Sequence, residues 1–71
     1  MKKDKYTLVG VDGNAYAIMA YVVNALKTEG KTKESIDAYL KDAKSSDYYH
    51  LIAVSYATIE SLNKEINNKK H

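Results

Sequence analysis

The stretch DYYHLIAVSYATIESLNKEIN, residues 47–67, carries the longest helical pattern in this sequence. Its main stripe recurs at spacings of three and four residues, as one face of an α-helix does, and consists of Tyr48, Leu51, Ile52, Ser55, Ile59, Leu62 and Ile66. Asp47 can cap the first turn, and Glu60 and Lys64 form a favourable pair four residues apart. The pattern predicts one helix over residues 47–67.

Two shorter amphipathic segments precede this helix. Asn14 is a good N-cap and Gly30 is suited to the position after a helix end, which predicts a helix over residues 14–28. Thr32 can accept a hydrogen bond from the Ser35 amide and predicts a second helix over residues 32–44. The apolar faces are Ala15, Ile18, Met19, Val22, Ala25 and Leu26 in the first helix, and Ile36, Tyr39, Leu40 and Ala43 in the second.

Three amphipathic helices joined by short turns predict an all-α fold, a compact three-helix bundle with an extended N-terminal arm. A chain of 71 residues without cysteine is near the size where one core is marginal, so its stability must come from apolar packing. The predicted core is Ile18, Met19, Val22, Leu26, Ile36, Leu40, Leu51, Ile52, Ile59 and Leu62. We expect residues 1–71 to form a single small helical domain with frayed tails at residues 1–5 and 68–71.

The segment YTLVGV, residues 6–11, alternates like a β-strand, although no second strand is evident downstream. The longest helix should span roughly 30 Å and the second only about 18 Å, so Leu62 and Ile66 should extend beyond it. We expect residues 6–11 to cover them as an extended arm. The alternative is an α+β fold in which this strand pairs between two copies, and monomer and homodimer both stay open.

The distribution of charged and apolar residues along the chain limits the classes of partner that it can bind. The net charge is +2, yet the two ends hold six Lys against two acids, whereas residues 6–63 hold five Lys against seven acids. Nucleic-acid binding, which needs a basic face on the folded domain, is therefore disfavoured. The longest apolar run, residues 15–23, is far shorter than the roughly 20 residues of a membrane span, so we expect no membrane contact and a cytoplasmic protein. Abundant Lys, Asn, Ile and Tyr fit an A/T-rich bacterial or phage genome.

The GVDG loop, residues 10–13, precedes a predicted helix N-terminus, where free amides favour anions. Asp12 would repel a phosphate and the loop has no Lys or Arg, so we interpret it as a turn that sets up the Asn14 cap. A calcium loop starting at Asp12 would need Gly and Glu at the positions that Ala17 and Val23 occupy. We therefore predict no cofactor.

Residues 47–50, Asp-Tyr-Tyr-His, form the densest polar and aromatic cluster. One His beside one Asp offers too few ligands for a metal site, and no Ser or Cys nucleophile has evident partners, so we predict no metal site, no catalytic residues and no enzyme activity. We favour a protein-interaction or regulatory module with a protein partner. The alternative is a nucleic-acid-associated accessory protein whose Lys-rich ends make weak phosphate contacts. The candidate partner-binding residues are Asp12, Asn14, Tyr16, Tyr21, Asp47, Tyr49, His50 and Tyr56.

The segments GNAYAIM, residues 13–19, and SSDYYHLI, residues 45–52, resemble a group of small bacterial and phage-borne proteins. Those proteins carry GNAFAIMG-like and SGDYDHLL-like segments and have no established activity. The resemblance covers residues 13–55, and this chain departs from it at Tyr16, Ala20, Ser46 and Tyr49, where the group has Phe, Gly, Gly and Asp. The resemblance implies a small helical protein and adds no mechanism.

Overall fold

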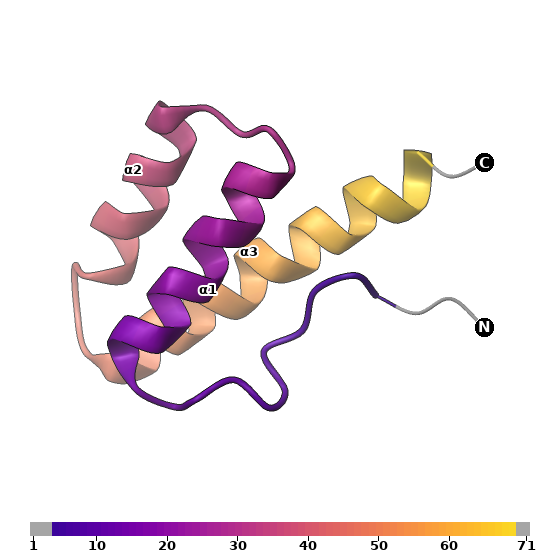
Figure 1. Cartoon of the computed structure of the whole chain (residues 1–71). Helices are drawn as coiled ribbons and strands as arrows, with labels where there is room; N and C mark the ends of the chain where they lie inside the picture. Colours follow the sequence, from indigo (N-terminus) through magenta and orange to yellow (C-terminus); the bar gives the residue numbers. More distant parts are fainter. Residues whose placement is uncertain (1–3, 70–71) are drawn as a thin grey trace.

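The computed structural model describes residues 4–69, and residues 1–3 and 70–71 lie outside that part. Three helices follow one another: α1 (Ala15–Thr28), α2 (Lys33–Ala43) and α3 (Tyr48–Lys69). The long helix α3 packs against both α1 and α2, and the chain before α1 runs beside the bundle as an extended arm (Figure 1). Residues 4–69 contain no strand, so the prediction of an all-α three-helix bundle with an N-terminal arm is confirmed.

Side-chain caps fix the starts of the first two helices, as the sequence predicts. Asn14 Oδ1 accepts a hydrogen bond from the Tyr16 N–H at 2.8 Å, and Thr32 Oγ1 accepts one from the Ser35 N–H at 3.1 Å. Each bond satisfies a backbone donor that a helix leaves unpaired in its first turn. The predicted bounds of α1 and α2 are therefore correct to within one residue.

Helix α3 ends at Lys69, two residues beyond its predicted end. Asn68 and Lys69, which we expected in a frayed tail, are helical. Near this end, Asn67 Nδ2 donates to Asp4 Oδ1 at 3.3 Å, which joins the last turns of α3 to the start of the arm. Residues 1–3 and 70–71 of the expected tails lie outside the described residues.

The core takes side chains from all three helices and from the arm. Its buried apolar members are Leu8, Ile18, Met19, Val22, Ala25, Leu26, Ile36, Tyr39, Ala43, Leu51, Ile59 and Leu62. Two predicted core residues, Leu40 and Ile52, are only half-buried and pack at its edge. Leu8 was not predicted in the core and is buried because the arm lays it against the bundle.

The arm packs within its own chain. It lines a shared hollow with Ile59 and Asn63. Leu62 and Ile66, which we expected the arm to cover, border a small cavity with Glu29, and the Tyr6 hydroxyl of the arm donates to Glu29. The covering of Leu62 and Ile66 by the arm stays a prediction.

Candidate functional site

An apolar groove lies between the arm, the start of α1 and the first turns of α3. It has a volume of about 340 Å³ and is lined by Leu8, Val11, Gly13, Ile18, Tyr48, Tyr49, Ile52 and Tyr56. Leu8 and Ile18 are buried and form its floor. We call this feature the tyrosine groove because three of its four lining residues from α3 are tyrosines.

The aromatic side chains of α3 leave much of their surface in solvent. Tyr49 is 81% exposed, Tyr56 is 52% exposed and Tyr48 is 45% exposed. The rings of Tyr48 and Tyr49 meet edge to face with their centroids 6.1 Å apart, a favoured aromatic geometry. Since Tyr48, Ile52 and Tyr56 are spaced four residues apart, they follow one side of α3 over about 12 Å. Apolar surface therefore continues along the groove for more than two helical turns.

A hydrogen bond joins the loop before α1 to α3, since the Tyr48 hydroxyl donates to the Gly13 carbonyl. The loop starts with a turn in which the Val11 N–H donates to the Leu8 carbonyl at 3.1 Å. Gly10 takes a φ of +88° in this turn, a region that residues with a Cβ rarely adopt. The turn and the hydrogen bond together fix Val11 opposite the tyrosines.

Two acidic residues adjoin, in the chain, the two groove residues that form this bond. Asp12 precedes Gly13 and Asp47 precedes Tyr48, so the hydrogen bond between Tyr48 and Gly13 brings both acids to the same end. Asp12 and Asp47 each accept a nearby backbone N–H through Oδ1, at 2.9 and 3.0 Å, and both are exposed. Each acid thus shapes a helix start and also places a negative charge beside the groove.

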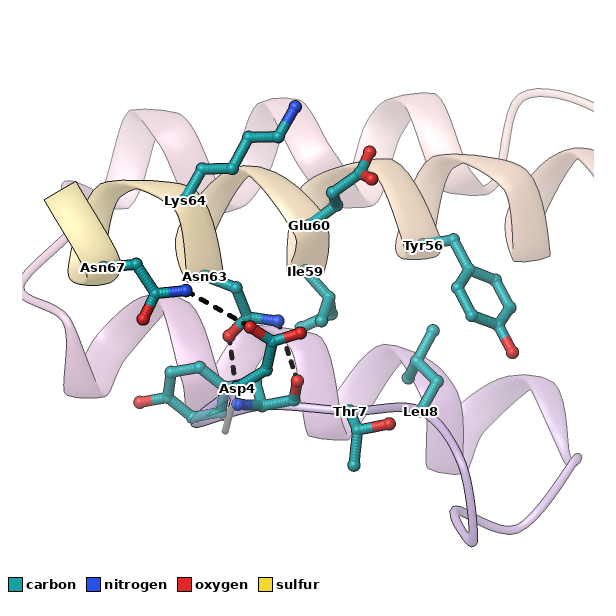
Figure 2. A pocket seen from close by; sticks show the side chains of 10 residues that line it. Asp4, Thr7, Leu8, Tyr56, Ile59, Glu60, Asn63, Lys64 and Asn67 are labelled. Carbon is teal, nitrogen blue, oxygen red and sulfur yellow. Dashed lines mark hydrogen bonds between the residues drawn. The ribbon is translucent and has the colours of Figure 1, made fainter. Parts of the chain in front are cut away.

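Asn63 points from α3 toward the arm (Figure 2), where it forms hydrogen bonds with the backbone of Tyr6. The Tyr6 N–H donates to Asn63 Oδ1 at 3.1 Å, and Asn63 Nδ2 donates to the Tyr6 carbonyl at 2.8 Å. The hollow around this pair has a volume of about 260 Å³, and Tyr56 lines both it and the tyrosine groove. Asp4, Glu60 and Lys64 also line this hollow, so it is more polar than the tyrosine groove.

The Glu29 carboxylate binds two side chains of the arm. Lys5 Nζ lies 2.8 Å from Glu29 Oε2, and the Tyr6 hydroxyl donates to the same oxygen at 2.6 Å. Burial and the hydrogen bond to Glu29 raise the pKa of Tyr6, and the hydrogen bond to Glu29 raises the pKa of Lys5. The Tyr21 hydroxyl accepts the Thr7 N–H at 2.9 Å. These contacts hold the arm against α1. The Tyr21 hydroxyl forms one of them.

His50 joins α2 to α3. Its Nε2 lies 2.9 Å from Asp42 Oδ1. The hydrogen bond to Asp42 is the main cause that raises the pKa of His50, and the charge of Asp47 adds to it. His50 therefore belongs to a junction between helices and is not part of the groove lining.

The structure brings part of the predicted partner-binding set together. Tyr49 and Tyr56 line the tyrosine groove, and Asp12 and Asp47 lie beside it. The other members lie elsewhere: Asn14 caps α1, Tyr16 is 80% exposed on its first turn outside the groove lining, and Tyr21 and His50 form internal hydrogen bonds.

Several residues of the groove were not among the predicted partner-binding residues, namely Leu8, Val11, Gly13, Ile18, Tyr48 and Ile52. A signal for two of them is present in α3. Tyr48 and Ile52 belong to the predicted apolar stripe of α3, and with Tyr56 they follow its edge beside the core residues Leu51 and Ile59. An apolar face this wide exceeds what contact with two neighbouring helices covers, and it marks a surface open to a further contact.

Within residues 4–69, no three His, Cys, Asp or Glu side chains are grouped so as to hold a metal ion. In the same part of the chain, no helix combines the length and the apolar character that crossing a bilayer requires. Family models, curated proteins and solved structures give no match to this chain. The resemblance to small bacterial and phage-borne proteins therefore stays a prediction.

Proposed function

We propose that this chain is a small non-enzymatic interaction module of bacterial or phage origin that binds a protein partner in the cytoplasm. The tyrosine groove carries the proposal: the exposed rings of Tyr49 and Tyr56 flank a floor formed by Leu8 and Ile18. Tyrosine is enriched at protein interfaces because its ring buries a large area while its hydroxyl keeps a hydrogen bond. A partner side chain that enters the groove would bury this apolar surface.

The loop beside the groove is held in place without a partner. Gly10 allows the turn that positions Val11, and the Tyr48 hydroxyl ties Gly13 to α3. A loop that is already held in place loses little conformational freedom on binding, so more of the contact energy contributes to affinity.

The charges favour a protein partner over nucleic acid. Lys5 pairs with Glu29 at 2.8 Å and Lys31 pairs with Glu65 at 2.6 Å, so phosphate contacts from these two lysines would compete with ion pairs inside the chain. Phosphates that approached the tyrosine groove would meet the carboxylates of Asp12 and Asp47. Neither feature hinders an apolar contact.

A capture experiment from the native host tests the proposal. The full chain is immobilised, and the proteins that it retains are compared with those retained by Tyr49→Ala and Tyr56→Ala. The matched control is Tyr16→Ala, which removes an equally exposed ring on α1 that does not line the groove. We expect a protein that the wild type and Tyr16→Ala retain, that both groove variants lose, and that moderate salt does not release.

Recovery of nucleic acid alone, released by moderate salt and unaffected by Tyr49→Ala and Tyr56→Ala, would contradict the proposal and support the alternative of phosphate contacts. A partner lost equally in Tyr16→Ala and in the groove variants would place the binding surface outside the groove.

A further inference from the structure

The tyrosine groove is apolar inside and acidic at one end, and these two features together select a class of partner. Its lining consists of aliphatic side chains, a glycine and three tyrosines, so the described lining carries no formal charge. The charges beside it come from Asp12 and Asp47, which the hydrogen bond between Tyr48 and Gly13 brings to one end. Two groups near these acids can carry a positive charge. Lys44 is the C-cap of α2, and His50, on which the charge of Asp47 acts, is paired with Asp42; neither lines the groove.

We propose that the groove binds a protein segment in which an apolar anchor side chain is flanked by lysine or arginine. This inference rests on the proposed function and names the partner that the site takes. The anchor would lie over Leu8 and Ile18, between Val11 and Ile52. The flanking cation would reach the carboxylates at the end of the groove.

The tyrosine rings also favour a cation. Tyr49 and Tyr56 are 81% and 52% exposed. The face of an aromatic ring attracts lysine and arginine side chains through its negative quadrupole, and arginine stacks on such a face as well. A basic flank can therefore contact carboxylates at one end of the groove and ring faces along its side.

The same charges disfavour other occupants. A symmetric dimer through this groove would bring together two copies of the same uncharged lining, so the partner's groove would offer no cation to Asp12 and Asp47. Nucleic acid and anionic lipid would bring phosphates toward these acids. A basic segment is the class whose charge complements the groove.

The two acids can be neutralised while their structural role is kept. Asn has the same shape as Asp and is an equally good N-cap, so the double variant Asp12→Asn/Asp47→Asn keeps an oxygen for each backbone N–H and removes both charges. The matched control is Glu34→Gln/Asp37→Asn, which removes two negative charges from exposed positions on α2.

The test uses the immobilised full chain and a library of short random peptides displayed on phage. Peptides are kept when the wild type binds them and Tyr49→Ala does not, and they are then synthesised and titrated against each variant by fluorescence anisotropy. We expect the retained peptides to be enriched in a large apolar residue beside Lys or Arg. Their dissociation constants should rise roughly fivefold in Asp12→Asn/Asp47→Asn, as the loss of two exposed ion pairs predicts, and stay unchanged in the control.

Three results would overturn the inference, and they bear differently on the proposed function. Tyr49-dependent peptides without basic enrichment, or with affinity unchanged in Asp12→Asn/Asp47→Asn, would reject the basic partner and leave the groove as a binding surface. Equal weakening in the control would assign the effect to the net charge of the whole chain. A library without any Tyr49-dependent peptide would reject both the basic partner and the groove as a peptide-binding site.

Discussion

Asn63 and Tyr6, 57 residues apart in the chain, form two hydrogen bonds in which one carboxamide pairs with both backbone groups of a single residue. A neighbouring strand would offer an N–H and a carbonyl to the arm, and the Asn63 side chain supplies the same two groups from a helix. This pairing lets a strand-like segment lie on α3 while the part of the chain that the structure describes contains no second strand.

Replacing Asn63 should loosen the arm. Asn63→Ala removes both partners of the Tyr6 backbone and should lower the free energy of unfolding by about 1–3 kcal/mol, because the half-buried N–H and carbonyl lose their hydrogen bonds. Urea denaturation followed by circular dichroism measures the change. The control is Asn67→Ala. The Asn67 side chain makes a longer hydrogen bond of 3.3 Å to Asp4, so its loss should lower the free energy of unfolding by less than about 0.5 kcal/mol. Equal effects of the two substitutions would refute the special role of Asn63.

The hydroxyls of Tyr39 and Ser55 form a buried pair at 2.6 Å, and burial raises the pKa of Tyr39. Tyr39→Phe and Ser55→Ala should each cost about 1–3 kcal/mol because each leaves the other hydroxyl without its partner inside the core. The double variant should cost less than the two single costs added, with a coupling of roughly 0.5–3 kcal/mol. Denaturation of all four proteins gives the coupling directly. Additive costs would show that the two hydroxyls do not depend on each other.

The helices and their caps could be predicted because their signals are local. The apolar spacing of three and four residues identifies α1, α2 and α3, and the caps Asn14 and Thr32 lie next to the amides that they bind. Ser55 was also placed correctly on the inner stripe of α3, where it is fully buried. Its partner, however, could not be named from the sequence, because spacing gives a residue's face and not the residue opposite it.

The arm and the groove depend on contacts between residues far apart in the chain. Nothing near Asn63 in the sequence indicates that it pairs with Tyr6. In the same way, nothing near Tyr48 indicates that its hydroxyl bonds to Gly13. For the same reason the sequence suggested separate interaction candidates at residues 12–16 and 47–50, whereas the structure joins parts of both at one groove. The stripe of apolar residues was visible in the sequence, but which part of it stays uncovered depends on the path of the arm.

Truncation of core side chains should separate fully buried from half-buried positions. Leu26 and Leu51 are each 5% exposed, and Leu26→Ala and Leu51→Ala should each cost about 2–5 kcal/mol through lost apolar contact and the cavity that remains. Ile52→Ala should cost less, because Ile52 is half-buried at the groove and solvent can fill the space. Thermal and urea unfolding provide the comparison. An Ile52→Ala cost equal to that of Leu51→Ala would show that Ile52 is a core residue.

The pair formed by His50 and Asp42 should make stability depend on pH. Because the hydrogen bond to Asp42 raises the pKa of His50 in the folded chain, the pair stabilises the fold below the ordinary pKa of histidine, and this stabilisation is lost as pH rises through the raised pKa. The wild type should therefore gain stability relative to Asp42→Asn as the pH falls from about 8 to about 5. NMR titration should show the pKa of His50 falling in Asp42→Asn. A His50 pKa that is the same in both proteins would contradict this assignment.

Two glycines of the loop beside the tyrosine groove should respond oppositely to the same substitution. Gly10 has a φ of +88°, so Gly10→Ala places a Cβ in a disfavoured backbone region and should destabilise the fold by about 1–2 kcal/mol. Gly13 has no positive φ, and a Cβ there would meet the Tyr48 hydroxyl at 3.6 Å, an ordinary contact. Gly13→Ala should therefore be neutral or slightly stabilising, since alanine restricts the unfolded chain. Urea denaturation of the two variants tests the contrast, and a Gly13→Ala variant less stable than Gly10→Ala would show that the loop takes another conformation in solution.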